Sequence, residues 1–158
     1  VGTSLVEEDQ MDTVKNVLEK AKAQNVEILL PIDHLMSKEF NGPADYIDIV
    51  DIPDGMMGLD IGGKTAMMYM SALQDCKTVL WNGPMGVFEN KAYSNGTFAI
   101  AKTLATLNAV TVVGGGDSVA AVNQAGVADK ISHISTGGGA SLEYLEYGTL
   151  PGIEILQA

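Results

Sequence analysis

Residues 110–126 read VTVVGGGDSVAAVNQAG, and this stretch decides the fold that the sequence predicts. The run Val110–Val113 is apolar and β-branched, as in strands that are covered on both faces. Three glycines and Asp117 follow, and then a stretch in which apolar residues recur at helical spacing. A strand, a glycine loop and a helix in this order are typical of the βα units that build parallel sheets.

The same unit recurs along the chain. Strands are predicted at Leu59–Ile61, Thr78–Trp81, Val110–Val113 and Ile131–Ser135. The helices predicted after them are Thr65–Leu73, Tyr93–Leu107, Ser118–Ala125 and Ala140–Tyr144. Upstream, a helix is predicted from its apolar stripe of Met11, Val14, Leu18 and Ala21. A strand is predicted at Val26–Leu30, closed by Pro31, and a further strand at Ile47–Ile52. This alternation predicts one α/β domain with a doubly wound parallel sheet in three Rossmann-like layers.

The composition excludes several classes of function. The 158 residues are 46% hydrophobic, which favours a folded domain. The net charge is −11 and all nine basic residues are lysines, so the surface repels nucleic acid. No apolar run reaches membrane-spanning length, and the single cysteine, Cys76, cannot form an internal disulfide. We therefore expect a cytoplasmic protein that binds neither nucleic acid nor membrane.

Three glycine-rich loops follow predicted strands: Asn82–Gly86, Gly114–Asp117 and Thr136–Gly139. Ligands of parallel α/β sheets bind beyond the carboxyl ends of the strands, which is where these loops are expected. Glycine lets backbone N–H groups approach a ligand, and a helix that begins just after it attracts anions. The three loops together indicate a polyphosphate site, although tight strand-to-helix turns would carry the same glycines.

Asp117 follows the second loop and has two interpretations. An aspartate in the first turn of a helix is often an N-cap. Beside a phosphate-binding loop it would instead hold Mg²⁺, which prefers one or two carboxylates together with phosphate oxygens.

Of two candidate phosphate-binding motifs, one is disfavoured by the residues that precede it and the other is excluded by a missing glycine. Residues Gly58–Thr65 fit the P-loop pattern GxxxxGK[ST] letter for letter. That motif requires an apolar strand before its first glycine, whereas the turn Pro53–Gly55 stands there. The loop at Gly114 would need a glycine at position 119 to be a dinucleotide fingerprint, and Val119 occupies it.

Three long motifs of the chain resemble the phosphoglycerate kinase family. They are Leu80–Glu89, Val113–Ser118 and Ser132–Glu143, and the stretches Ser4–Asp9 and Leu150–Ile153 fit as well, so the resemblance extends over essentially the whole chain. It implies reversible transfer of the acyl phosphate of 1,3-bisphosphoglycerate to ADP, giving ATP and 3-phosphoglycerate, with Mg²⁺ and ATP or ADP bound by this part.

The resemblance also implies roles for individual residues. The base and sugar of the nucleotide would contact Gly58, Gly83, Met85 and Phe88, with Glu89 on the ribose hydroxyls and Asn82 near the phosphates. Phosphate and magnesium would be held by Gly115, Gly116, Asp117 and Ser118. Gly137 and Gly138 would steady the phosphoryl group in flight, and Ser135 and Thr136 match the hinge between the two domains of the family.

Residues 1–158 are therefore expected to be a partial C-terminal nucleotide-binding domain, with its sheet truncated on the N-terminal side and the substrate domain absent. An isolated chain of this kind is expected to be inactive, because phosphoryl transfer depends on positioning both substrates. The parent enzyme is expected to be a monomer. For the piece, the exposed sheet edge implies a missing companion segment, disorder or self-association. Two alternatives are a non-catalytic α/β fragment that binds no nucleotide and an unrelated P-loop NTPase.

Overall fold

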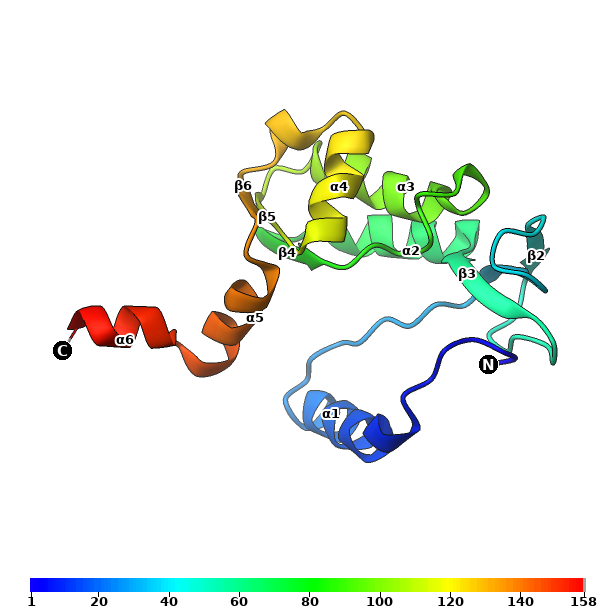
Figure 1. Cartoon of the computed structure of the whole chain (residues 1–158), viewed down its shortest axis with the longest axis horizontal. Helices are drawn as coiled ribbons and strands as arrows, with labels where there is room; N and C mark the ends of the chain where they lie inside the picture. Colours follow the sequence, from blue (N-terminus) through cyan, green and yellow to red (C-terminus); the bar gives the residue numbers. More distant parts are fainter. Residues whose placement is uncertain (158) are drawn as a thin grey trace.

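The computed structural model describes residues 1–157 and shows an α/β protein with two separate sheets (Figure 1). The strands are β1 (His34–Ser37), β2 (Asp45–Ile47), β3 (Met57–Ile61), β4 (Thr78–Asn82), β5 (Val110–Gly114) and β6 (His133–Ser135). The α-helices are α1 (Met11–Ala23), α2 (Gly63–Leu73), α3 (Asn95–Leu104), α4 (Gly116–Gln124), α5 (Gly138–Tyr147) and α6 (Pro151–Gln157). Short 3-10 helices are η1 (Glu8–Gln10), η2 (Lys91–Tyr93) and η3 (Ala128–Lys130).

The strands β4, β5 and β6 form a parallel sheet in that order. Helix α3 connects β4 to β5 and helix α4 connects β5 to β6, as parallel pairing requires. The βα units predicted around residues 78–125 are therefore confirmed. The helix predicted at residues 93–107 is shorter, because η2 and a break at Ser94 precede α3.

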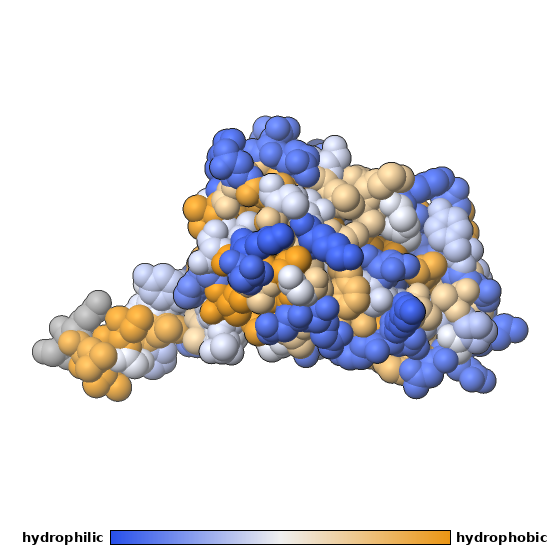
Figure 2. Space-filling model, turned by 90° about the horizontal axis from the view of Figure 1, so that it is seen from above, coloured by the Kyte–Doolittle hydropathy of each residue, from blue (hydrophilic) through white to orange (hydrophobic). Residues whose placement is uncertain are grey.

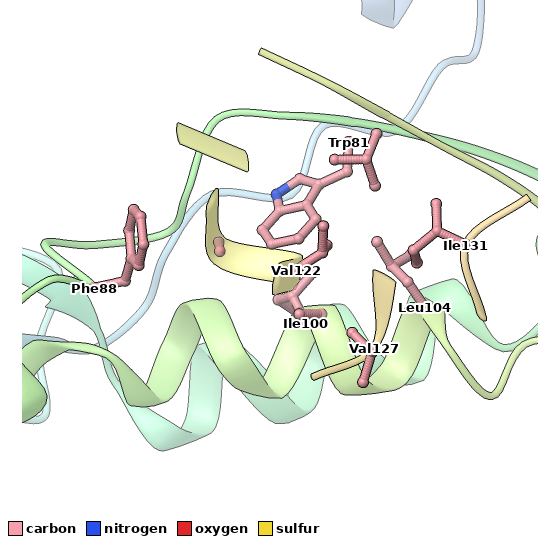
Figure 3. Packing of buried hydrophobic residues seen from close by; sticks show 10 residues of the cluster. Trp81, Phe88, Ile100, Leu104, Val122, Val127 and Ile131 are labelled. Carbon is pink, nitrogen blue, oxygen red and sulfur yellow. The ribbon is translucent and has the colours of Figure 1, made fainter. Parts of the chain in front are cut away.

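The core lies between the parallel sheet and helices α3 and α4 (Figure 3). Helix α3 presents Thr97, Ile100, Ala101 and Leu104 to the interior, the three- and four-residue spacing of a helix with one buried face. Trp81 of β4 is packed against this face together with Val122 of α4. Helix α2 adds partly buried residues to the same cluster.

The other face of the parallel sheet is only partly covered. Helix α5 borders it, and an open pocket of about 600 Å³ between the helix and the sheet is lined by Leu80, Val112 and Tyr144. Beyond α5, helix α6 projects away from the body (Figure 1) and carries the exposed side chains Ile155 and Leu156, which form the apolar tip in Figure 2. Within residues 1–157, every helix falls short of the length or apolar character that a bilayer-spanning segment requires.

The predicted fold class, α/β with a truncated parallel sheet, is confirmed. The second sheet is antiparallel, with the order β2-β1-β3, so the strand predicted at Leu59–Ile61 forms but does not join the parallel sheet as expected. The strands β1 and β2 were not predicted, because they are too short to show an apolar period. The strand predicted at Ile47–Ile52 is also wrong. Strand β2 ends at Ile47, and Ile49 and Val50 lie in an exposed bend before Pro53.

The strand predicted at Val26–Leu30 does not form either. Among the described residues no strand pairs with it, and a strand without a hydrogen-bonded neighbour is not stable in water. The segment instead runs as an extended connection between α1 and β1, with Val26 and Leu30 exposed (Figure 1). One side-chain bond fastens it to α2, since the Tyr69 hydroxyl donates to the carbonyl of Leu29 at 3.2 Å.

Helix α1 confirms the helix predicted at the start of the chain. Its apolar stripe is not buried, however, and Met11, Val14 and Leu18 are all exposed. In Figure 1 this helix lies apart from both sheets. The pattern thus predicted the secondary structure correctly, while no described element covers the stripe.

Candidate functional site

The register of the parallel sheet brings the three glycine loops to one rim. Asn82 at the end of β4 is paired with Gly114 at the end of β5, and Gly114 is paired with Ser135 at the end of β6. The three strands therefore end abreast, and the loop that follows each begins at the same edge. The expectation that these loops share one location is confirmed.

Close packing joins the second and third loops. A Cβ atom added to Gly138 would lie 2.5 Å from the Cα atom and 2.6 Å from the amide nitrogen of Gly115. Neither backbone atom can move aside cheaply, so position 138 requires glycine. Gly115 itself has a φ of +89°, a conformation that glycine adopts without strain.

Polar contacts connect the first loop to the second. The backbone N–H of Gly83 donates to the Ser118 hydroxyl at 2.6 Å. A Cβ atom on Gly115 would meet the side-chain oxygen of Asn82 at 3.0 Å, so the Asn82 side chain reaches over the second loop. Ser118 is fully buried, which gives its hydroxyl the task of holding the first loop in place. The three loops form one packed unit.

Two helices begin at this rim with free N-termini. Helix α4 starts at Gly116 and helix α5 at Gly138, and within residues 1–157 no side chain accepts a hydrogen bond from their first-turn N–H groups. The free N–H groups and the positive ends of the two helix dipoles create an environment that favours an anion. Asp117 lies exposed in the first turn of α4 and caps no N–H group there, so its carboxylate is available to a ligand.

The rim contains no complete metal site of its own. Among the described residues, no group of three His, Cys, Asp or Glu side chains gathers at metal-binding distance. Mg²⁺ normally takes one or two carboxylates and completes its shell with phosphate oxygens and water. A single exposed carboxylate, Asp117, next to two free helix N-termini fits that pattern.

The residues matched to the hinge lie at the third loop. The hydroxyl of Ser135 lies 2.7 Å from that of Ser141 in α5, and the Ser141 hydroxyl donates to the carbonyl of Gly137 at 3.1 Å. Thr136 is exposed between them. These contacts fix the direction in which α5 leaves the sheet.

The predicted base-side residues are divided between a pocket and the core. Gly58 and Met85 line a pocket of about 380 Å³ that lies between strand β3 of the antiparallel sheet and the first glycine loop, which contributes Pro84 and Gly86 as well. Phe88 does not reach that pocket. It is buried, and its ring packs edge to face on Phe98 at a centroid distance of 6.5 Å.

Glu89, the residue expected at the ribose, is exposed at the end of the same loop. Gly58 is covered rather than open: its N–H donates to the Ser4 hydroxyl at 3.0 Å, and an added Cβ atom would meet Ile52 at 2.6 Å. Of the base-side residues, Gly58 and Met85 therefore line the pocket, while the phosphate-side residues lie at the rim.

Sequence reasoning missed the residues that hold the first loop. The Thr97 hydroxyl, buried at the start of α3, accepts hydrogen bonds from the N–H groups of Met85 at 3.0 Å and Gly86 at 3.3 Å. Asp60 is buried beneath the same loop. A threonine inside a helix carries no local signal for this contact. The aspartate is a charged residue within an apolar strand, which marks the position as unusual but does not indicate its partner, Gly96.

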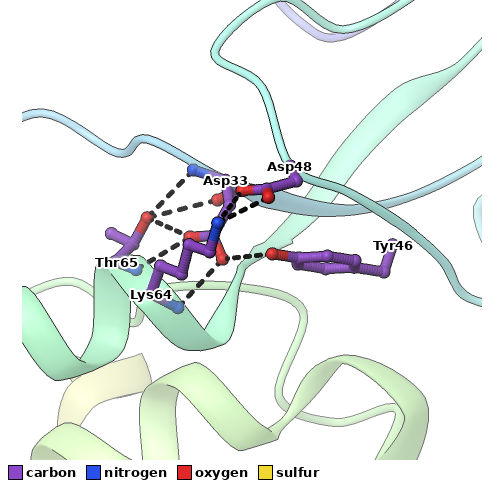
Figure 4. A network of polar contacts seen from close by, with 5 residues as sticks. All are labelled: Asp33, Tyr46, Asp48, Lys64 and Thr65. Carbon is purple, nitrogen blue, oxygen red and sulfur yellow. Dashed lines mark hydrogen bonds and ion pairs between the residues drawn. The ribbon is translucent and has the colours of Figure 1, made fainter.

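The P-loop pattern at Gly58–Thr65 does not form a P-loop (Figure 4). Strand β3 runs through its first four positions, and the site at the start of α2 is filled by the carboxylate of Asp33. One oxygen of Asp33 accepts the N–H of Lys64 at 2.9 Å, and the other accepts the N–H of Thr65 at 2.8 Å. Asp33 is fully buried, so a phosphate has no room there.

The side chains of this motif have partners within the protein. The Lys64 ammonium donates to Asp48 at 2.6 Å, and the Thr65 hydroxyl donates to Asp33. Burial raises the pKa of Asp33, but the hydrogen bonds from Thr65, Lys64 and Tyr46 together outweigh it and leave the pKa below its ordinary value. The group is therefore a structural anion that stabilises its helix.

The fold and the rim define an α/β protein of the class that binds phosphate groups at the carboxyl ends of parallel strands. A model of the phosphoglycerate kinase family matches residues 1–148. The chain belongs to the phosphoglycerate kinase family.

Relatives of known name agree with this placement. The chain is 53% identical over 158 residues to a phosphoglycerate kinase of Clostridium kluyveri and 55% identical over 157 residues to one of Clostridium botulinum, with 99% of the chain aligned in each case. Among solved structures, phosphoglycerate kinase from Coxiella burnetii matches with a TM-score of 0.91 at 38% identity, covering 99% of this chain and 40% of that one. The enzyme from Pyrococcus horikoshii matches with a TM-score of 0.79 at 33% identity, covering 96% of this chain and 38% of that one. The chain spans about 40% of the length of the curated relatives.

Proposed function

We propose that this chain is the partial C-terminal domain that supplies the nucleotide side of phosphoglycerate kinase. The reaction is the reversible transfer of the acyl phosphate of 1,3-bisphosphoglycerate to ADP, which gives ATP and 3-phosphoglycerate. Family membership supports this proposal. So does the geometry of the rim, where three glycine loops and two free helix N-termini stand abreast.

The observation that carries the proposal is the pair of helix N-termini, at the starts of α4 and α5, whose first N–H groups point to the rim without a side-chain cap. Gly115 and Gly116 would donate N–H groups to the phosphates of the nucleotide, with Asn82 beside them. Gly137 and Gly138 would face the phosphoryl group during transfer, where backbone donors stabilise the charge that develops on its oxygens. Of these donors, Gly115 and Gly138 are held in place by their close packing on one another.

Mg²⁺ would lie at Asp117 and would neutralise charge on the nucleotide phosphates during transfer. The base and ribose would lie toward the pocket that Gly58 and Met85 line, with Gly83 also on the base and sugar side and Glu89 on the ribose hydroxyls. Phe88 would act from the core by supporting this loop. Ser118 would act by holding Gly83, since its hydroxyl is already engaged there.

The acyl-phosphate substrate is proposed to bind residues outside these 158. The chain contains no arginine, and its nine lysines are spread over its length, so it offers no basic cluster for a second phosphorylated substrate. Transfer requires both substrates to be positioned together. The expected result is nucleotide binding without turnover when this chain is assayed alone.

Titration with Mg-ADP, followed through backbone amide shifts, tests the proposal. Shifts are expected at Gly115, Gly116 and Ser118, and Asp117→Asn should reduce them. The matched control is Lys64→Ala, which changes the P-loop pattern and should leave the binding curve unaltered. If these amides show no shift up to millimolar Mg-ADP, the alternative of an α/β chain that binds no nucleotide would be favoured. Loss of binding in Lys64→Ala would instead restore the P-loop interpretation.

A further inference from the structure

Asp60 of β3 is a buried carboxylate that the nucleotide roles above do not use. Only 4% of its surface is exposed. One oxygen accepts the N–H of Ile61 at 2.9 Å, and the other accepts the N–H of Gly96, in the first turn of α3, at 2.8 Å. It therefore joins the antiparallel sheet to the helix that follows the first glycine loop.

The carboxylate is also in contact with the loop itself. A Cβ atom added to Gly86 would lie 2.4 Å from an Asp60 oxygen and 2.5 Å from the carbonyl oxygen of Leu59, and one added to Gly96 would lie 2.4 Å from the same Asp60 oxygen. Both glycines are needed because the carboxylate fits between the loop and the helix. The backbone of Val87 closes the contact, since its N–H donates to the carbonyl of Leu59 at 2.8 Å.

A chain of hydrogen bonds leads from Asp60 to the residues of the loop. Asp60 fixes Gly96, and the next residue, Thr97, accepts the N–H groups of Met85 and Gly86. The start of α3 thus holds the loop, and Asp60 holds the start of α3. A shift of Gly96 would carry with it the neighbouring Thr97 hydroxyl, which is the acceptor for both loop donors.

We propose that Asp60 is a positioning residue of the nucleotide site, and that its negative charge fixes the loop Asn82–Glu89 against strand β3 and helix α3. The loop is then ordered when Asp60 is ionised and loosened when it is protonated. This inference rests on the proposed function only for the consequence on nucleotide binding, because the effect on the loop itself does not require a ligand.

The charge of Asp60 is unfavourable for the fold as a whole. Burial raises the pKa of Asp60 to about 6, and the hydrogen bonds from Gly96 and Ile61 only partly offset that rise. A carboxyl whose folded pKa lies above its unfolded value destabilises the folded state once it ionises, so the contribution of Asp60 to global stability rises as the pH falls from about 7 to about 4.5. A residue that costs stability at neutral pH while holding a loop is typical of a functional position.

Other titratable groups near this position have separate partners. The carboxylate of Asp33 is turned to the start of α2, and the His34 ring nitrogen Nε2 lies 3.1 Å from the carbonyl oxygen of Val50. Glu89 and Lys91 are exposed beyond the loop. Within the described part of the chain, the hydrogen bonds to the Asp60 carboxylate come from backbone N–H groups alone.

The test is a pH titration of the backbone amides of the whole chain from about pH 8 to about pH 4.5, with hydrogen-exchange protection and urea stability measured at each pH. The amides of Met85 and Gly86 should titrate with a midpoint near 6 and lose about fivefold or more of their protection below it, while global stability does not fall. Asp60→Asn should abolish the midpoint, and His34→Gln should preserve it. Titration of Gly96 and Ile61 without Met85 and Gly86 would overturn the proposal, as would a midpoint that survives Asp60→Asn.

A second readout separates positioning from mere structure. The ratio of the Mg-ADP Kd of Asp60→Asn to that of the wild-type chain, taken at the same pH, should be about five at pH 7.5 and fall to about one at pH 5, because the wild-type residue is then uncharged as well. A ratio that does not change with pH would refute the link to the nucleotide. Failure of both proteins to bind Mg-ADP would count against the proposed function, while the amide titration would still decide the role of Asp60.

Discussion

Four helices of this protein begin beside a strand end, and they fall into two pairs. Helices α2 and α3 begin on buried carboxylates of the chain itself, Asp33 and Asp60 respectively. Helices α4 and α5 begin on glycines, and within residues 1–157 no acceptor meets their first N–H groups. The physical requirement is the same at all four, because every helix N-terminus has donors without intrahelical partners. The first pair satisfies that requirement internally, and the second leaves it to a ligand.

Whether an internal acceptor fills the helix N-terminus decides phosphate binding more than a match to a sequence motif does. Helix α2 carries the pattern GxxxxGK[ST], which in other proteins binds phosphate, yet an internal anion fills its site. Helices α4 and α5 carry less specific glycine runs, and their sites are open. Removing an internal anion, closing the rim and removing the carboxylate at the rim should therefore affect the two pairs of helices differently.

Asp33→Ala should have the largest effect. It leaves the N–H groups of Lys64 and Thr65 and the hydroxyls of Thr65 and Tyr46 without their acceptor in a buried site. Loss of several hydrogen bonds to a buried charge should lower the free energy of unfolding by about 3–5 kcal/mol, measured by urea denaturation. Asp48→Ala, which removes an exposed carboxylate of the same network, should have a far smaller effect.

The pH dependence of Asp33 has a definite sign. Its pKa lies below the ordinary value of 3.8, so its contribution is present above about pH 4 and is lost as the pH falls through the folded pKa. The wild-type chain should therefore lose stability below about pH 4, and Asp33→Ala should show a weaker acid dependence there. If the free energy of unfolding falls equally steeply below about pH 4 in both proteins, the structural role given to Asp33 would be contradicted.

Gly138→Ala should have the next largest effect. Its new Cβ atom would lie 2.5 Å from the Gly115 backbone, so the second and third loops must separate. Overpacking of this kind should cost about 1–3 kcal/mol and should weaken Mg-ADP binding as well. The matched control is Gly139→Ala at the next position, where an added Cβ atom meets nothing within 4 Å. The control should be neutral or stabilising, because alanine favours a helix over glycine.

Asp117→Asn should act on the ligand and hardly on the fold. The side chain is exposed and caps nothing, so the urea midpoint should change little. Loss of the one carboxylate at the rim should raise the Kd for Mg-ADP about tenfold, by isothermal titration, while the affinity for ADP in EDTA should be the same in both proteins. An equal loss in EDTA would mean that Asp117 does not act through the metal.

Much of the fold was predictable because its signals are local. The strands β4 and β5, the helices α2 and α4 and the three glycine loops all follow from apolar runs and glycines within about ten residues of each other. Their convergence was predictable as well, since parallel strands connected by helices must end at one edge.

The errors all depend on distant partners. Val26–Leu30 has the composition of a strand but no paired neighbour among residues 1–157, whereas His34–Ser37 lacks the composition and becomes a strand because β3 lies beside it. In the site, Thr97 and Asp60 act across 11 and 36 residues of sequence, on Gly86 and Gly96 respectively, and no local pattern encodes such contacts. The P-loop pattern at Gly58–Thr65 wrongly indicates a phosphate site for the same reason. The residue that fills the start of α2, Asp33, lies outside the motif.

Lys64→Met should have the smallest effect, and it tests the comparison most directly. The lysine of a working P-loop contacts the phosphates, so its removal abolishes nucleotide binding. Here the ammonium pairs with Asp48 at an exposed position, and surface ion pairs contribute little and are screened by salt. The variant should bind Mg-ADP with an unchanged Kd, and its small shift in urea midpoint should vanish in about 1 M NaCl. A change in Kd comparable to that of Asp117→Asn would show that α2 contacts the nucleotide, and the division of the helices into two pairs would not stand.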